Sequence, residues 1–205
     1  MNENYDKKMT EQLKNAKSGA KILLHSCCAP CSSTCLERVK DFLQVSVFYY
    51  NPNIDDEDEY QKRKAEQIRF LTQTGWAEFV DCDHDATAFE RVAKGLENEP
   101  ERGKRCYLCY ALRLEKTAQK AKELGFDYFG TTLSVSPYKN AAWLNEIGER
   151  LQEKYGVEYL YADFKKQGGY YRSQELSKEH DLYRQDYCGC RFSKAERQQK
   201  TGETD

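Results

Sequence analysis

The sequence lacks any long hydrophobic run. Its longest strand-like apolar stretches are Ile22–Leu24 and Val45–Tyr50, far short of the roughly 20 residues that cross a bilayer. The first residues, MNENYDKKMTEQ, contain no apolar core of a secretory signal. We therefore expect a cytoplasmic protein that has no membrane partner.

The sequence also lacks an excess of positive or of negative charge. The 205 residues include 32 Lys or Arg and 34 Asp or Glu, which gives a formal net charge of -2. This balance excludes a globally basic nucleic-acid coat but leaves room for a local basic patch. The three histidines are too few and too scattered for a familiar metal or triad motif. No phosphate-binding loop of the P-loop or GxGxxG type is present.

Cysteine, by contrast, is abundant. Nine cysteines are an odd number, and in a reducing compartment they argue against a framework of structural disulfides. Metal binding or redox chemistry is the better explanation. Three groups stand out: Cys27-Cys28 with Cys31, Cys106-x-x-Cys109, and Cys188-x-Cys190.

Strands alternate with helices along the chain. Apolar segments at 20–26, 44–51, 76–83, 126–132 and 157–162 predict strands, and the segments between most of them predict amphipathic helices. This alternation is typical of parallel βαβ units, so we expect an α/β three-layer sandwich with a mostly parallel, Rossmann-like sheet of about five strands. Residues 1–192 would form a single domain, and residues 193–205 a polar, disordered tail.

Chemically unusual residues follow the predicted strand ends. In open α/β sheets, ligands bind outside the carboxyl ends of the strands, so we expect one site on one rim. Asp81 and Asp83 follow the third strand, where burial near a metal centre can raise a carboxyl pKa and make the group a general acid. Capping of the next helix by Asp83 or Asp85 explains the same residues equally well.

A polar set follows the fourth strand. It suits a hydroxyl-rich or phosphorylated ligand, but it also suits an ordinary helix start with Pro137 at the first position. Basic residues interleaved with tyrosines near residue 171 are of a kind that contacts phosphates and stacks on bases. The candidate substrate-binding residues are Asn51, Asn53, Ser134, Ser136, Tyr138, Lys139 and Arg172.

The Cys106-x-x-Cys109 pair lies at the start of a helix predicted over 105–124. The i, i+3 spacing puts both sulfurs on one face, and a helix N-terminus favours thiolate over thiol. A lone CxxC fits a zinc half-site, a dithiol or an iron–sulfur half-site. A zinc ribbon would need a second CxxC about 15–20 residues away, which the sequence lacks, and the available partner is Cys27-Cys28. Four thiolates from two segments at a sheet rim favour a 4Fe-4S cluster over zinc or thiol redox chemistry.

The Cys188-x-Cys190 pair has a different spacing. With one glycine between them, the two sulfurs can form a tight, easily reduced disulfide that stores two electrons. The alternative is that both are additional metal ligands, for example of a further iron. Cys35 lies on an apolar helical stripe and Cys82 alternates along a strand, so both are expected to be packed, while the role of Cys31 stays open.

Longer segments resemble a known family. The motifs are HSCCAPCSS, YYNPNI followed by EYQKR, RCYLCYALRLEKTAQKAKELGFDYFGTTLSVSPYKN and YADFKKQGGYYRSQELSKEHDLYRQDYCGCRFS. They run from about residue 21 to residue 193 and resemble the QueH-type epoxyqueuosine reductases, which do not use cobalamin. The resemblance implies a fold similar to the nucleotide alpha-hydrolases, with Cys27-Cys28 in the place of their phosphate loop.

The resemblance also implies a site. By the family pattern Cys27, Cys28, Cys106 and Cys109 ligate a 4Fe-4S cluster, Cys188 and Cys190 form the redox-active pair, and a further iron lies beside the cluster. The implied reaction is the last step of queuosine biosynthesis. The epoxide oxygen of epoxyqueuosine, at the wobble position of the tRNA anticodon, is removed as water in a two-electron reduction.

This reaction needs partners that the motifs do not identify. The electrons come from a donor of unknown identity, and an acid must protonate the departing oxygen, for which Asp81, Asp83 and Tyr107 are candidates by position. Two other functions compete with the reductase. One is an iron–sulfur tRNA sulfurtransferase, which would need an intact nucleotide loop, and the other is a non-catalytic, zinc-stapled RNA-binding module.

Overall fold

A fully parallel, five-stranded sheet forms the centre of the molecule. The structure, a computed structural model, describes residues 3–202, and the strand order is β3-β2-β1-β4-β5. The strands are β1 (Lys21–His25), β2 (Gln44–Phe48), β3 (Glu78–Val80), β4 (Tyr128–Thr131) and β5 (Glu158–Tyr159). The predicted α/β class and parallel sheet are confirmed, although the two edge strands are shorter than the sequence indicated.

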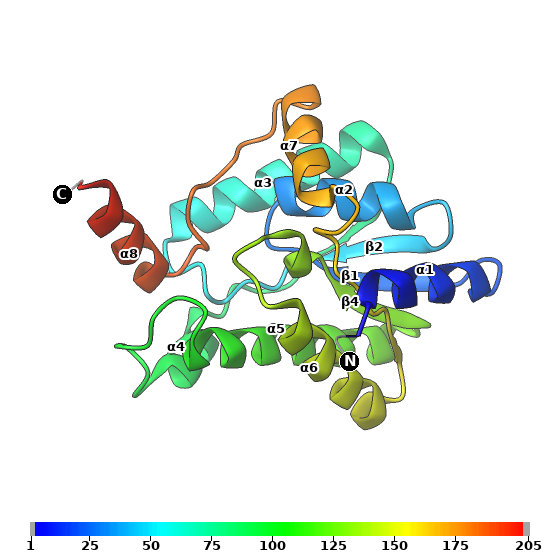
Figure 1. Ribbon diagram of the computed structural model, residues 1–205, viewed down its shortest axis with the longest axis horizontal. Helices are drawn as coiled ribbons and strands as arrows, with labels where there is room; N and C mark the ends of the chain where they lie inside the picture. Colours follow the sequence, from blue (N-terminus) through cyan, green and yellow to red (C-terminus); the bar gives the residue numbers. More distant parts are fainter. Residues whose placement is uncertain (1–2, 203–205) are drawn as a thin grey trace.

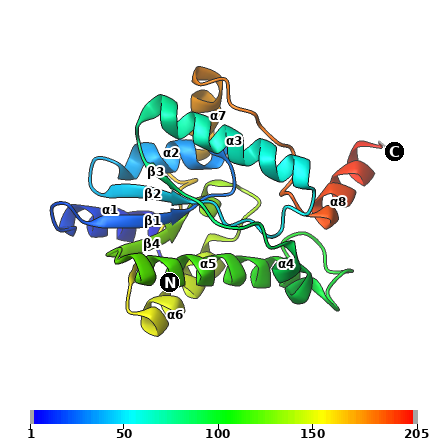
Figure 2. The same ribbon diagram turned by 180° about the vertical axis from the view of Figure 1, so that it is seen from behind.

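Helices cover both faces of the sheet (Figure 1). On one face lie α2 (Ala29–Val39), α3 (Glu57–Thr74) and α7 (Gly169–Glu179). On the other lie α4 (Ala86–Ala93), α5 (Lys104–Leu124) and α6 (Ala141–Tyr155), an arrangement that Figure 2 shows from behind. Helix α1 (Tyr5–Asn15) contacts the β5 edge through Gln12, whose Nε2 donates to Tyr159 O. Among the described residues, none of the helices combines the length and the apolar character that a bilayer crossing requires.

The core has two layers, one on each face of the sheet. Ile22, Leu23 and Leu24 of the central strand are all fully buried, as expected for a strand covered on both faces. Since side chains alternate along a strand, Ile22 and Leu24 pack into the cluster that contains Leu36 of α2, and Leu23 packs with Leu114 of α5. The central strand therefore fixes the positions of both helix layers relative to the carboxyl ends of the strands.

The segment after β4 begins with a short 3-10 turn, η1 (Thr132–Val135), and not directly with a helix. Helix α6 starts later than predicted, because Asn140 is its N-cap and accepts a hydrogen bond from Trp143 N at 3.2 Å. Pro137 therefore lies four residues before the helix and not at its first position. The residues between η1 and α6 remain a loop at the carboxyl end of β4.

The tail predicted to be disordered, residues 193–205, is helical as far as Thr201, and its last three residues lie outside the described part of the chain. Helix α8 covers Arg191–Thr201, and the side chain of Ser193 is buried. The aromatic ring of Phe192 packs against Phe89 and under the guanidinium of Arg105, which also pairs with Glu196 at 3.7 Å. Contacts from distant segments stabilise this helix, which explains why its polar sequence did not predict it.

Candidate metal centre

The turn after β1 brings three sulfur atoms together. β1 ends at His25, and Pro30 occupies the first turn of α2, a position that suits its fixed φ and missing N–H. The Sγ atoms of Cys27 and Cys28 are 3.7 Å apart, and that of Cys31 lies within 4.8 Å of both. Three thiols in this arrangement can hold a metal ion. The sequence left Cys31 open, and the structure groups it with the other two.

One sulfur of this group is ready to bind a metal as thiolate. Burial alone would raise the pKa of Cys28, but contacts with Cys27 and Cys31, the charge of Arg63 and a 2.8 Å hydrogen bond from Gln185 Nε2 hold it well below its usual value. The contact with Cys28 raises the pKa of Cys27 to about 11, and similar contacts raise that of Cys31. Thiolate is the metal-binding form of cysteine, and these contacts favour it within this group of three sulfurs.

The second group lies at the start of α5, as predicted. Gly103 is the N-cap, Cys106 Sγ accepts a hydrogen bond from Arg102 N at 3.3 Å, and Cys109 follows one turn later in a buried position. Burial raises the pKa of both thiols, that of Cys109 to about 11. The helix N-terminus alone therefore does not make them thiolates, and a bound metal would have to displace their protons.

The third group requires its glycine. Gly189, between Cys188 and Cys190, has a φ of 118°, which side-chain-bearing residues rarely adopt, and a Cβ there would lie 2.8 Å from Ile54 Cγ1. Both neighbouring cysteines are free thiols in this structure. The backbone N–H of Cys188 donates to Ser193 Oγ at 3.1 Å, so the start of α8 holds this turn in place.

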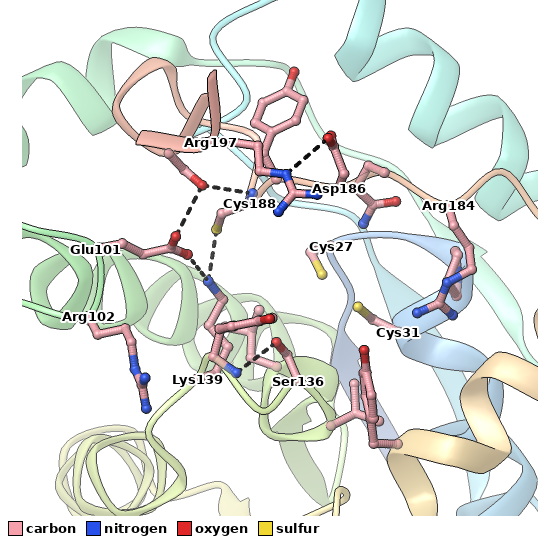
Figure 3. A pocket seen from close by; sticks show the side chains of 18 of the residues that line it. Cys27, Cys31, Glu101, Arg102, Ser136, Lys139, Arg184, Asp186, Cys188 and Arg197 are labelled. Atoms are coloured by element: carbon pink, nitrogen blue, oxygen red, sulfur yellow. Dashed lines mark hydrogen bonds and ion pairs between the residues drawn. The ribbon is translucent and has the colours of Figure 1, made fainter. Parts of the chain in front are cut away.

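Two hollows that share Cys188 and Arg113 bring the three groups to one region. The larger one is a cavity with a volume of about 370 Å³, and Cys27, Cys31 and Cys188 are among the residues that line it. Figure 3 shows Cys27 and Cys31 on one side of this cavity and Cys188 on the other. A narrower pocket beside it is lined by Cys106, Cys109, Cys188 and Cys190. Cysteines from three distant segments therefore line two hollows that have Cys188 in common.

A buried lysine reaches the third group. Lys139 is 7% exposed, and its Nζ donates to Cys188 Sγ at 3.0 Å and pairs with Glu101 Oε1 at 3.5 Å (Figure 3). Burial by itself would lower the pKa of Lys139, but Cys188, Tyr110 and Glu101 raise it well above the usual value. Lys139 is therefore an ammonium group in direct contact with a thiol.

Two buried arginines also face the cysteines. Arg63 Nε pairs with Glu59 at 2.6 Å, and its Nη1 donates to Cys188 O. Arg113 lines both the cavity and the narrower pocket, and its Nη1 and Nη2 have no hydrogen-bond partner within residues 3–202. A set of thiols beside an unpaired, buried cation fits an anionic iron–sulfur cluster, whose negative charge would supply the missing partner.

Several of the predicted substrate contacts lie at this rim. Ser136, Tyr138 and Lys139 line the cavity, and Asn53 lines the narrower pocket. Asn51 supports the cysteine turn, because its Nδ2 donates to Ser26 O at 2.8 Å. Ser134 has a structural contact, since its Oγ accepts from Phe164 N at 3.2 Å.

The three acid candidates lie away from the cavity. Asp81 pairs with Lys64 on the outer side of the edge strand β3, and Asp83 is exposed. Tyr107 is one residue after Cys106, about 100° further around the helix, so its hydroxyl contacts Glu146 of α6. None of the three lines the cavity or the narrower pocket. Asp85 caps α4 through Ala88 N, as the alternative interpretation proposed.

Arg172 is also outside the cavity lining. Its guanidinium binds Glu37 of α2 and Glu175 and Glu179 of its own helix, at 2.8 to 3.1 Å. All three carboxylates form ion pairs with the guanidinium where α7 packs on α2. The charge of Arg172 is therefore balanced within the protein, and its contact with substrate stays a prediction. Cys35, by contrast, is fully buried in the core as predicted.

The sequence reasoning missed the charged residues of the cavity. The apolar face predicted for the helix over 105–124 was Leu108, Ala111, Leu112, Ala118 and Ala121. Ala118 and Ala121 are buried as predicted, but the buried face also includes Cys109, Arg113 and Thr117, at i, i+4 and i+8. That spacing was a usable signal for Arg113. Glu101 and Gln185 lie in irregular segments, and nothing in their sequence neighbourhood indicated a contact with cysteine.

The sequence matches a known protein family over most of its length. Residues 22–196 match the family described as epoxyqueuosine reductase QueH. The chain is 43% identical over 198 residues to an epoxyqueuosine reductase QueH of Streptococcus pyogenes serotype M1, covering 93% of this chain and 78% of the relative. It is 38% identical over 186 residues to the protein of that name from Thermotoga maritima, covering 89% and 94%.

A solved structure confirms the fold class. The U34-tRNA thiolase NcsA from Methanococcus maripaludis, solved with its 4Fe-4S cluster, superposes with a TM-score of 0.55 over 91% of this chain and 67% of the thiolase. The sequence identity of 12% means that this likeness concerns the fold alone. The family match spans most of the chain, and the relatives found by sequence are much more similar to this chain than the thiolase is. The chain therefore belongs to the QueH family of epoxyqueuosine reductases, which are oxidoreductases.

Proposed function

We propose that this chain reduces epoxyqueuosine to queuosine at the wobble position of a tRNA anticodon. Two electrons and two protons enter, both carbon–oxygen bonds of the epoxide break, a carbon–carbon double bond forms, and the oxygen leaves as water. The observation that carries the proposal is that three cysteine groups line the cavity and the narrower pocket, which share Cys188 and Arg113, in a chain of the QueH family.

The cofactor proposed for this site is a 4Fe-4S cluster. Cys27 and Cys28, from the turn after β1, and Cys106 and Cys109, from the start of α5, would hold it. When bound, such a cluster supplies electrons one at a time. The pKa of Cys28 is held well below its usual value, and Cys109 is buried beside Cys106. Arg113 offers two free N–H groups beside these ligands.

We assign both electrons and both protons of this reaction to Cys188 and Cys190. Oxidation of this pair to a disulfide releases two electrons and two protons, which balances the removal of one epoxide oxygen as water. An external reductant then returns two electrons and two protons to the pair. An iron bound at these two sulfurs is the alternative, and the iron count described below separates the two.

The cavity offers contacts for one flipped-out nucleoside. Tyr138, which is 60% exposed, lies at the rim together with Arg102, Arg184 and Arg197. An exposed ring can stack on a base, and the arginines can contact phosphate or ribose oxygens. Single-stranded loops are recognised by such local contacts, so a net charge of -2 is compatible with a tRNA substrate.

Lys139 is expected to take part in the chemical step. Its ammonium donates to Cys188 Sγ, so Lys139→Met removes the only charged donor on that sulfur among the described contacts. We expect kcat to fall on the order of 10²-fold while the iron content stays at the wild-type level. The matched control is Lys165→Met, because Lys165 is a half-buried lysine paired with Asp163 outside the cavity lining. An unchanged kcat for Lys139→Met would remove Lys139 from the mechanism.

Two measurements on anaerobically purified protein test the proposed function. Metal analysis is expected to give about four irons with matching sulfide and a brown colour. Incubation with dithionite and tRNA that contains epoxyqueuosine, followed by nuclease digestion and mass spectrometry, is expected to show a nucleoside that has lost the mass of one oxygen atom. The control is the same mixture without protein.

Each alternative gives a different outcome. One zinc per chain and no colour would support the zinc-stapled RNA-binding module. Iron with a gain of sulfur in the tRNA, in place of a loss of oxygen, would support the sulfurtransferase. A fifth iron that disappears in a Cys188→Ser, Cys190→Ser double variant would assign that pair to metal binding. Iron without any change in the tRNA would overturn the reductase proposal.

A further inference from the structure

We propose that Arg113 is the counter-cation of the iron–sulfur cluster and that it raises the reduction potential of the cluster. This inference rests on the cluster assignment made under the proposed function. It concerns a residue of α5 that is no metal ligand and that acts through its charge. Three sets of observations support it.

The first observation is that the guanidinium of Arg113 is buried without an ion-pair partner. Its side chain is fully buried, and Nε donates to Cys109 O at 3.3 Å. Nη1 and Nη2 have no hydrogen-bond partner, and no carboxylate of residues 3–202 forms an ion pair with Arg113 within 4.0 Å. An uncompensated charge of this kind is strongly destabilising, so the conformation calls for a negative partner.

The second observation is the position of Arg113 between the sulfur groups. It lines the cavity together with Cys27 and Cys31, and the narrower pocket together with Cys106 and Cys109. Burial alone would lower its pKa, but the sulfurs of Cys109, Cys188 and Cys27 raise it, so the group keeps its charge. The groups that can balance Arg113 are therefore the cysteines, together with whatever they bind.

The third observation comes from the other two fully buried arginines. Arg105 donates to the backbone carbonyls of Leu96, Glu97 and Glu99 and lies 3.7 Å from Glu196. Arg63 pairs with Glu59. Both have a carboxylate partner and Arg113 has none, so burial of an arginine in this fold does not by itself leave the charge unpaired.

A 4Fe-4S cluster with four thiolate ligands supplies the missing negative charge. Reduction adds one electron and no bond changes, so the cluster becomes more negative by one charge. A fixed cation in a site shielded from water stabilises the reduced form more than the oxidised form. Loss of Arg113 should therefore make the cluster harder to reduce, and it should also remove an unpaired charge from the metal-free protein.

The test is a dithionite titration followed by electron paramagnetic resonance on reconstituted, full-length protein. Arg113→Met is expected to shift the reduction equilibrium at least tenfold toward the oxidised cluster, which is about 59 mV for one electron. Arg113→Lys keeps the charge and should recover most of the wild-type midpoint. The matched control is Arg38→Met, which removes one positive charge from a pair with Asp6 away from the cavity and should leave the midpoint unchanged.

A second readout covers the case in which Arg113→Met takes up no cluster. The metal-free variant is then expected to unfold at a temperature at least about 4 °C above that of metal-free wild type, since the unpaired charge is gone. A metal-free variant that is less stable than wild type would overturn the inference, as would a loaded variant with the wild-type midpoint. Wild-type protein that binds no iron would instead overturn the proposed function.

Discussion

Cys106→Ala protein, purified without oxygen, is expected to contain less than about one iron per chain in place of about four, and to lose its brown colour. Cys106 lies in the first turn of α5, facing the narrower pocket with Cys109, and alanine offers no ligand atom there. Because three remaining thiolates would leave one iron exposed, the cluster should be lost during purification. Iron and sulfide analysis with the visible absorption spectrum measures this result.

A second cysteine provides the matched control for Cys106→Ala. Cys82 is also half-buried at the carboxyl rim, but its Sγ contacts Tyr49 O at 3.2 Å and lines neither the cavity nor the narrower pocket. Cys82→Ala should therefore keep its full iron content. Iron content at the wild-type level in Cys106→Ala would remove this residue from the ligand set and point to Cys31 as the replacement.

Cys188→Ser protein is expected to keep the cluster and to lose on the order of 10³-fold or more in deoxygenation rate, as is usual when a residue of the chemical step is removed. The hydroxyl that replaces the thiol still accepts from Lys139, so the local structure should hold, but it cannot form a disulfide with Cys190. Single-turnover assays on tRNA, scored by mass spectrometry, measure the rate.

Cys190→Ser should have a similar effect, because either change leaves one unpaired thiol. Thiol titration before and after one turnover without external reductant adds an independent readout. We expect two thiols to disappear in wild type and none in either variant. Full turnover by Cys188→Ser would refute the assignment of this pair as the source of electrons.

Local patterns were sufficient to predict the architecture. The strands at 20–26 and 44–51 contain continuous apolar runs bounded by polar turns, and between them lies a segment with helical periodicity. Parallel strands need such crossovers, so the alternation leads directly to the sheet and its rim. The same reasoning failed for α8, because Phe192 and Ser193 gain their partners from α4, α5 and the Cys188 turn.

Sequence spacing predicted the site residues that lie on a helix face or directly after a strand. It did not predict those whose position depends on the path of a loop. Cys106 and Cys109 share a helix face at i, i+3, and Cys27-Cys28 follows a strand end, so both groups belonged at the rim. The acid candidates lie outside the cavity lining for a matching reason. Tyr107 is next to Cys106 in sequence but its hydroxyl contacts Glu146 of α6, and Asp81, after the short edge strand β3, pairs with Lys64.

The sequence by itself determined which residue types are available and which end of the sheet they occupy, since helical and strand periodicity are properties of neighbouring residues. Only the tertiary structure decided which of the sulfurs face one another and which charges they meet. Lys139 reaches Cys188 across 49 positions of chain, and Gln185 reaches Cys28 across 157. Contacts of this kind depend on the course of loops over the rim, and no local pattern encodes that course.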